Sequence, residues 1–383
     1  MNKVAIVVPA YKTKLNSFEK ISLKQMKRVL GKYPIVMVIP ESLVLIDDLE
    51  NTGFGIERFP DEFFSGIESY SRLCLSDVFY NRFSDYEYIL IYQLDAFVFE
   101  DKLDEFCNMA YDYLGAPEPV RLWPYLKNRV GCGGFSLRRV SACRRILESK
   151  DDIFLRMRNE YPQEIVSKAL YLEDCFWAYC GQQEDLNFRV PDLDEALRFS
   201  VEMNVNNVFE KMEKHLPFGV HKWYAENFDV WWPIIKKYGY QVSDDDVRKY
   251  AHCGAEHERW IRCEELAEGD KMPELRSFIW DKVKSDVVRI YGHGDMGKSA
   301  IKVLNVLGFT VQAVYDSGVN RYNQSGCTPV SEENINTYDS PILICCKGAG
   351  LVIENNLSKM IRNKTKCFQW MDIEKEIVNS FVD

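Results

Sequence analysis

The most constraining feature of this sequence is an apolar run at residues 88–99 that contains two polar side chains, Gln93 and Asp95. The run is rich in β-branched and aromatic residues, which is typical of a strand buried on both faces of a parallel sheet. A carboxylate in such a strand is costly unless it is paired, hydrogen-bonded or bound to a metal ion. Asp95 therefore either caps a turn or binds a divalent cation at the carboxyl end of the strand, where open α/β sheets bind their ligands.

The composition is that of a chain with two or three domains and ordinary apolar cores, since 46% of its 383 residues are hydrophobic. The net charge is −10, with 48 basic against 58 acidic residues, which argues against a nucleic-acid partner. The longest apolar runs are strand-sized, so we expect no transmembrane segment and at most a peripheral association with a membrane. The N-terminal run is too short for a signal peptide, and the 12 cysteines form no C-x-x-C pair. We therefore expect a cytoplasmic protein with reduced thiols.

The N-terminal segment has the order of a parallel α/β fold. Residues 3–8 and 35–39 predict two strands joined by a helix, which implies a right-handed crossover. The first strand ends at Pro9, which has no N–H to donate to a neighbouring strand. Pro9, Ala10 and Tyr11 then lie just beyond the strand end. There Tyr11 either stacks on a base or ribose, or packs over the sheet edge.

Two further segments predict places where a ligand approaches the backbone or a charged side chain. A helix expected at residues 67–83 carries Arg72 among apolar neighbours, where it either reaches a phosphate group or extends from the surface. Gly133 and Gly134 precede a short apolar strand. Glycines at such positions allow positive φ or the close approach of another group.

Acidic and imidazole side chains supply the candidates for catalysis and metal binding. Glu173 and Asp174 stand just before an apolar segment, where an acid is favoured by the dipole of a helix N-terminus or acts as a general base. His221 lies in the segment Gly219–Trp223 among aromatic residues, where it is either packed or a ligand.

The C-terminal part predicts a second, smaller domain. We expect a large first domain at 1–240, a helical connector at 241–284 and a small Rossmann-like domain at 285–383. This last domain begins with strand, G-x-G-x-x-G, helix, strand and acid, which is the context of a dinucleotide-binding fingerprint. A second nucleotide site would use Gly292, Gly294, Gly297 and Asp316. The alternative is a structural or docking domain that keeps the glycines for packing.

Residues 1 to about 240 resemble a bacterial family of GT-A-type glycosyltransferases. The resemblance rests on four short motifs in the same order: Gln93-Leu94-Asp95-Ala96, Gly133-Gly134-Phe135-Ser136-Leu137-Arg138, Glu173-Asp174 and Gly219-Val220-His221-Lys222-Trp223. In two places the sequence departs from the family pattern. Gln93 stands where many GT-A enzymes have the first Asp of D-x-D, and Cys132 stands where the family often has Asn.

The resemblance implies an α/β fold with a mixed, mainly parallel sheet flanked by helices. It implies a metal-dependent transfer of a sugar from a nucleotide-sugar donor to a glycan or lipid-linked acceptor. Mn²⁺ or Mg²⁺ would be held by Asp95 and His221, and Asp174 would be the general base of an inverting reaction, with Glu173 binding the acceptor or orienting Asp174. The donor would contact Pro9, Ala10, Tyr11, Arg72, Gln93 and Asp95. The acceptor would contact Trp123, Gly133, Gly134 and Phe135.

The alternative functions use the C-terminal domain instead. They are an NAD(P)-dependent oxidoreductase and a non-enzymatic nucleotide-binding protein. Almost nothing follows the glycine fingerprint that would supply a substrate domain, so we expect NAD(P) not to be used.

Overall fold

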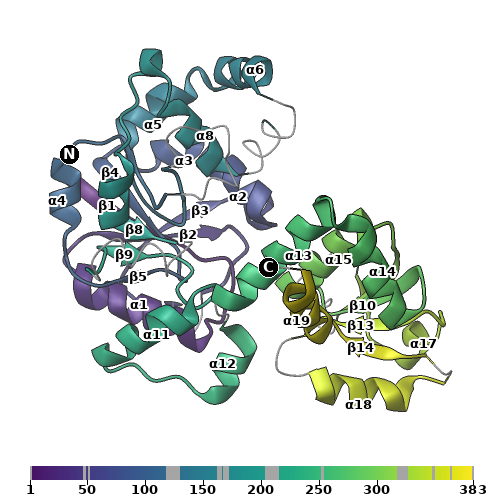
Figure 1. Cartoon of the computed structure of the whole chain (residues 1–383). Coiled ribbons are helices and arrows are strands. Elements are labelled where there is room, and N and C mark those ends of the chain that lie inside the picture. The colour runs from purple at the N-terminus through teal and green to yellow at the C-terminus, as the bar shows by residue number, and fades with distance from the viewer. Residues whose placement is uncertain are drawn as a thin grey trace. The chain divides into compact units, whose positions relative to one another are not determined.

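The computed structural model describes residues 2–45, 49–50, 52–117, 130–161, 166, 172–202, 215–251, 254–316, 327–346, 350–362 and 365–381. The chain forms two compact units, Met1–Asp246 and Val247–Asp383, each with its own sheet (Figure 1). No helix in the described parts of the chain is both long enough and apolar enough to cross a membrane.

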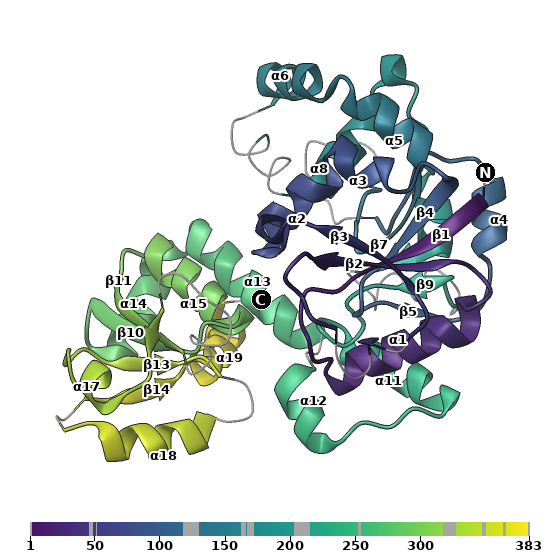
Figure 2. The ribbon, with the colours of Figure 1, turned by 180° about the vertical axis from the view of Figure 1, so that it is seen from behind.

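The first unit is built on a six-stranded sheet of order β3-β2-β1-β4-β7-β6. Among these strands only β7 runs against its neighbours, so the sheet is mixed and mainly parallel, as expected. Figure 2 shows β1 and β4 side by side in the middle of the sheet. The strands are β1 (Asn2–Pro9), β2 (Ile35–Pro40), β3 (Gly55–Phe59), β4 (Tyr86–Tyr92), β6 (Tyr113–Leu114) and β7 (Phe135–Arg139).

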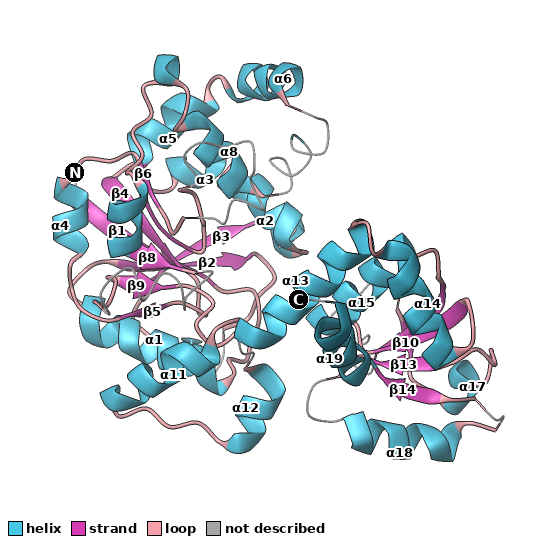
Figure 3. Cartoon of the chain, viewed as in Figure 1, coloured by secondary structure: helices cyan, strands magenta, loops and turns pink. Residues whose placement is uncertain are grey.

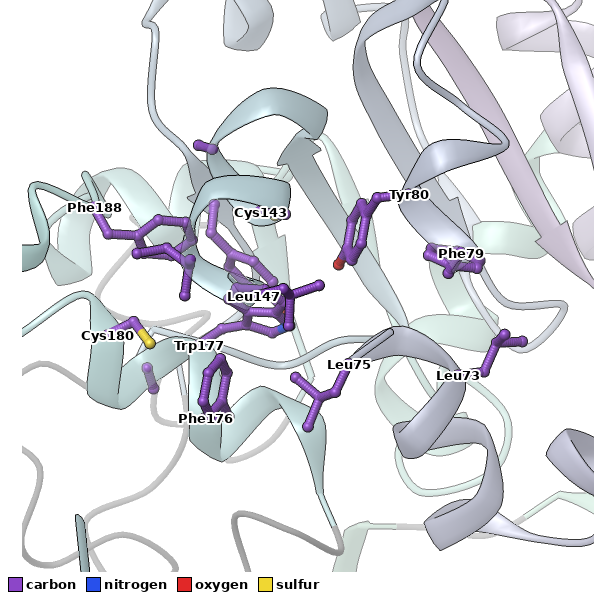
Figure 4. Packing of buried hydrophobic residues seen from close by; sticks show 14 of the residues in the cluster. Leu73, Leu75, Phe79, Tyr80, Cys143, Leu147, Phe176, Trp177, Cys180 and Phe188 are labelled. Atoms are coloured by element: carbon purple, nitrogen blue, oxygen red, sulfur yellow. The ribbon is translucent and has the colours of Figure 1, made fainter. Parts of the chain in front are cut away.

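Helices cover both faces of this sheet (Figure 3). Alternate residues of each strand point to opposite faces, so Ile89 and Ile91 join one apolar cluster and Leu90 joins the other. The first cluster includes side chains from α2, α3, α5, α6 and α8, and Figure 4 shows part of it around Trp177. The second includes side chains from α1, α4 and α9. The helical segments are α1 (Ser17–Leu30), η2 (Asp61–Phe64), α2 (Ile67–Cys74), α3 (Asp77–Asn81), α4 (Leu103–Asn108), α5 (Val140–Leu147), α6 (Lys150–Glu160), α8 (Glu173–Cys180), η3 (Glu184–Leu186), α9 (Leu193–Phe199), α11 (Phe228–Ile235), η4 (Lys236–Tyr238) and α12 (Asp244–Tyr250).

A small three-stranded sheet begins just after the carboxyl end of β4. It consists of β5 (Phe97–Val98), β9 (Gly219–Val220) and β8 (Ser200–Val201) in the order β5-β9-β8. The prediction of a single strand over residues 88–99 is therefore wrong, because β4 ends at Tyr92 and a turn separates it from β5. In that turn the N–H of Ala96 donates to the carbonyl of Gln93 at 2.9 Å. The turn allows the chain to leave the large sheet and pair with β9.

The second unit contains a five-stranded, entirely parallel sheet of order β12-β11-β10-β13-β14. Apolar clusters lie on both of its faces, as in a small α/β domain. The strands are β10 (Val287–Tyr291), β11 (Thr310–Asp316), β12 (Thr328–Pro329), β13 (Ile342–Ile344) and β14 (Cys367–Gln369). The helices are α13 (Gly254–Glu268), α14 (Met272–Val283), α15 (Asp295–Val306), α17 (Glu332–Ile335), α18 (Gly350–Met360) and α19 (Trp370–Phe381).

Two helices expected to belong to a separate connector, α13 and α14, are part of the core of this second unit. Trp260 of α13 and Ile279 of α14 are buried in the same apolar cluster as Ile290 of β10 and Trp370 of α19. The expected boundaries of 241–284 and 285–383 therefore differ from the observed division after Asp246.

Candidate functional site

The carboxyl ends of β1 and β4 form the point of the large sheet where the strand order changes direction. From β1 the chain proceeds to β2 and β3 on one side, and then returns to place β4 on the other side. Val7 of β1 pairs with Ile91 of β4, so both strands end at the same edge of the sheet. Ligands of open α/β sheets bind at such a point. Tyr11, which follows β1, is 62% exposed there, so its ring is accessible to a ligand.

His221 lies next to both polar residues of the expected metal-binding segment, Gln93 and Asp95. Its Nε2 lies 3.1 Å from Oδ1 of Asp95 and 3.1 Å from Oε1 of Gln93. The ring is buried, while the Asp95 side chain is 24% exposed, so part of it is accessible to a ligand. A carboxylate oxygen, an amide oxygen and an imidazole nitrogen thus converge on one point. No group of three or more His, Cys, Asp or Glu residues suited to a metal ion occurs among the described residues.

Glu202 is a member of this site that the sequence did not reveal. Its Oε2 lies 2.9 Å from Nδ1 of His221, and its Oε1 lies 3.0 Å from Nζ of Lys222. Lys222 also contacts Glu226 at 2.9 Å. Glu202 follows β8, and the parallel pairing of β8 with β9 places it beside His221. No sequence motif contains Glu202, so only the pairing of these two short strands identifies it.

The two carboxylates beside His221 favour the protonated form of its imidazole. Burial alone would lower the pKa of His221, but Asp95 and Glu202 raise it to about 10. Burial acts to raise the pKa of Asp95, and the nearby His221 outweighs this effect and lowers it. In Glu202, burial again acts to raise the pKa, whereas Lys222 and His221 lower it. The imidazole of His221 therefore holds its proton more tightly than a free histidine does.

Gly133 and Gly134 allow the backbone before β7 to pack directly on this cluster. A Cβ atom on Gly134 would lie 2.1 Å from both Cε1 and Nε2 of His221, and one on Gly133 would lie 2.3 Å from Oε1 of Glu173. In addition, the N–H of Gln93 donates to the carbonyl of Gly134 at 2.9 Å. The close approach expected of these glycines is thus made by side chains of the protein itself.

Glu173 forms a buried ion pair with Arg138. Nη2 of Arg138 lies 2.7 Å from Oε1 of Glu173, and Nη1 lies 3.1 Å from Oε2, so the pair is bidentate. The guanidinium is fully buried and also donates to the Ser136 hydroxyl and the Gly133 carbonyl. Since both carboxylate oxygens are engaged by Arg138, this arrangement fixes the beginning of α8 against the Gly133 segment.

Asp174 occupies the first turn of α8 and is half-buried. Its Oδ1 accepts a hydrogen bond from the N–H of Cys175 at 3.0 Å. This position is compatible with a helix N-terminal acid, and the partial exposure is compatible with a general base. Asp174 is adjacent in sequence to Glu173, which touches Gly133, so the glycine segment connects α8 to the His221 cluster.

Two of the other expected contacts have a different setting, and a third cannot be described. Phe135 is fully buried and its ring packs against Tyr92 at a centroid distance of 5.6 Å, so the expectation that it faces an acceptor is wrong. Arg72 forms an exposed ion pair with Glu68 at 3.2 Å and lines a separate cavity that contains no other residue of the expected donor site. Trp123 lies outside the described residues.

The glycine loop of the second unit is largely explained by its own backbone. Gly292 has a φ of +100°, and a Cβ on Gly297 would lie 2.0 Å from the Gly292 carbonyl oxygen. Oδ2 of Asp316 accepts a hydrogen bond from the N–H of His293 at 2.8 Å. Around Gly294, by contrast, a Cβ would meet no described atom within 4 Å. Two of the three glycines and the acid therefore have roles in folding the loop.

Comparison with known protein families identifies one match. A family model described as "Protein of unknown function (DUF5672)" matches residues 53–221, which is less than half of the chain. The match begins before β3 and ends at His221, so it contains Gln93, Asp95, Asp174 and Glu202. No curated protein matches the sequence.

Proposed function

We propose that the first unit transfers a sugar from a nucleoside-diphosphate donor to a hydroxyl group of an acceptor. The observation that carries the proposal is the contact of His221 with both Gln93 and Asp95 at the carboxyl end of β4. Two of the motifs on which the glycosyltransferase resemblance rests thereby form one cluster. A third, the Gly133-Gly134 segment, packs directly on it.

The residues of this cluster fit a hard divalent cation such as Mn²⁺ or Mg²⁺. Asp95 and Gln93 would offer oxygen ligands, which such cations prefer, and His221 would offer Nε2 after losing its proton. Glu202 would stay on the Nδ1 side of the ring and fix its orientation and tautomer, as carboxylates do behind metal-bound histidines. When bound, the cation would supply positive charge for the leaving diphosphate.

The donor nucleotide would lie over the ends of β1 and β4. Tyr11 is exposed at this edge and offers an aromatic face on which a base can stack. Pro9 and Ala10 form the short link from β1 to Tyr11, and the N–H of Ala10 is engaged by the carbonyl of Val38 at 2.9 Å. This link fixes the position from which Tyr11 extends.

Asp174 would act as the general base. Its carboxylate would take the proton of the acceptor hydroxyl while that oxygen forms a bond to the anomeric carbon. The bond from this carbon to the diphosphate breaks in the same step, so the configuration is inverted. The buried Arg138–Glu173 pair would hold the first turn of α8, and with it Asp174, in place. A base of this kind must lie within hydrogen-bond reach of the hydroxyl that it deprotonates.

A donor panel tests the proposal. The parent protein is incubated with different nucleotide sugars, with Mn²⁺ or with EDTA, and the release of nucleoside diphosphate is measured. We expect release from one class of donor that depends on the cation and increases with the right acceptor. Absence of release from every donor in the panel, with or without acceptors, would contradict the proposed transfer.

A further inference from the structure

A cavity separate from the His221 cluster opens between α2 and α6 of the first unit. It has a volume of about 400 Å³ and is lined by Arg72, Leu75, Lys150, Asp151, Phe154 and Arg158. The proposed transfer reaction does not use any of these side chains. The cavity is nevertheless close to α8, because the N–H of Glu173 contacts the hydroxyl of Ser71, the neighbour of Arg72.

The charge of this cavity is opposite to that of the chain. Its lining contains three cationic residues and one acidic residue, a balance of +2, whereas the whole chain carries −10. Such a local excess of positive charge in an acidic protein favours an anionic ligand. Two of the three cations are arginines, whose planar guanidinium groups match the geometry of phosphate oxygens.

The cationic side chains can donate hydrogen bonds to a ligand. Arg158 is exposed, and Arg72 is engaged by Glu68 in an exposed i,i+4 ion pair at 3.2 Å. Exposed pairs of this type contribute little to stability, so a phosphate group can replace the carboxylate at small cost. Lys150 donates to the Leu75 carbonyl at 3.0 Å, which fixes its ammonium at the cavity and uses one of three N–H groups.

The cavity also has an apolar floor. Leu75 and Phe154 are 4% and 6% exposed and belong to the apolar cluster of Figure 4, in which Leu75 and Phe176 are labelled. The ring of Phe154 packs against that of Phe176 at 5.0 Å. Next to Phe154, Leu155 is 56% exposed on α6. An anionic group held by the cations would therefore lie beside apolar surface.

We propose that the cavity between α2 and α6 binds the phosphate group of a phosphate-bearing molecule, with Arg72, Lys150 and Arg158 as its donors and the Leu75–Phe154 floor against the less polar part of the ligand. Two sources share this chemistry, a soluble phosphate ester and the headgroup of a phospholipid. The inference does not depend on the proposed transfer, because binding can be measured without donor or turnover.

Binding is measured in EDTA, so that a divalent cation at Asp95 plays no part. Glucose 1-phosphate is titrated calorimetrically, and retention on phosphatidylcholine vesicles is compared with and without phosphatidic acid. We expect the parent to bind at least one probe, and the Arg72→Gln/Arg158→Gln double variant to bind it on the order of tenfold or more weakly, because charge-assisted hydrogen bonds are lost. Response to the sugar phosphate indicates a soluble ester, and retention that requires phosphatidic acid indicates a lipid headgroup.

Arg156→Gln is the matched control. Arg156 lies on the same helix α6 and carries the same charge, but it pairs with Asp185 at 2.6 Å and does not line the cavity. We expect this variant to bind like the parent. The proposal is overturned if neither probe binds to the parent, if the double variant binds as tightly as the parent, or if Arg156→Gln weakens binding as much as the double variant.

Discussion

His221 Nε2 and Asp95 Oδ1 lie 3.1 Å apart in the first unit, although the two residues are far apart in the sequence. The antiparallel pairing of β5 with β9 produces this contact, since Asp95 precedes β5 and His221 follows β9. The small sheet therefore brings a carboxylate at the end of β4 and an imidazole from a distant loop to the edge where β1 also ends.

Glu202→Gln should weaken cation binding at this edge by about 10- to 100-fold, the usual effect of removing a partner behind a metal ligand. The amide cannot stabilise the Nδ1 proton as a carboxylate does, so the ring of His221 loses its fixed orientation. Titration of Mn²⁺, followed by its electron paramagnetic resonance signal, measures the affinity. Glu226→Gln is the control, because Glu226 contacts Lys222 but has no contact with His221 among the ion pairs of the described residues. Equal affinity in the parent and in Glu202→Gln would remove Glu202 from the site.

Asp174→Asn should lower the rate of sugar transfer by a factor on the order of 10² or more, the usual size of a general-base effect. The affinity for the donor should be nearly unchanged, because the base acts on the acceptor in the transition state. Single-turnover kinetics and donor titration separate the two quantities. A variant that loses donor affinity but keeps its turnover would show that Asp174 is a structural acid of α8.

The stability of the protein in EDTA should fall as the pH rises from about 6.5 towards 10. Folding raises the pKa of His221 from 6.5 to about 10, so the folded state holds the proton more tightly than the unfolded state. This contribution is complete below pH 6.5 and is lost as the pH rises through the pKa of the folded state. We expect a loss of about 1 kcal/mol or more, since one pKa unit corresponds to about 1.4 kcal/mol.

Chemical denaturation at a series of pH values measures this effect. His221→Gln is compared with the parent, so that the titration of other groups cancels in the difference. The difference in unfolding free energy should shrink as the pH increases. A difference that is constant between pH 6 and 10 would show that the charge of His221 does not contribute to stability.

The sequence predicted the first two strands of the first unit well, because their apolar runs are strong local signals. Strands expected at residues 3–8 and 35–39 correspond to β1 and β2. The helix expected at 67–83 is instead two helices, α2 and α3. The break occurs at Leu75–Ser76, where the Ser76 hydroxyl accepts from the N–H of Phe79 and caps α3.

Local sequence patterns could not predict the parts of the site that depend on contacts between distant segments of the chain. Glu202 became recognisable only through the β8–β9 pairing. Glu173 and Arg138 were each noted within a motif, but their ion pair depends on how α8 packs on β7. Phe135 was mistaken for a ligand contact because an aromatic residue after two glycines has the same sequence pattern whether it is buried or exposed.

A fragment of residues 1–246 should fold and keep the intrinsic rate of sugar transfer. Each unit has its own sheet and apolar clusters, and no residue of the proposed site lies beyond Asp246. We expect the removal of residues 247–383 to affect solubility, assembly or partner recruitment instead, and we expect no redox chemistry in that unit. Tight NAD(P) binding by the second unit, together with loss of turnover in the fragment, would make the protein bifunctional and contradict this prediction.

The most direct test of the account is donor binding by the parent and by Asp95→Asn, measured calorimetrically with Mn²⁺ and with EDTA. The substitution removes the charge of the ligand but keeps its shape, so circular dichroism and thermal unfolding serve as the check on the fold. His221→Ala is measured in parallel and should weaken binding less severely, because Asp95 remains. We predict that Mn²⁺ strengthens donor binding in the parent and has no effect in Asp95→Asn. The same Mn²⁺-dependent gain in affinity in both proteins would contradict a cation site at the end of β4.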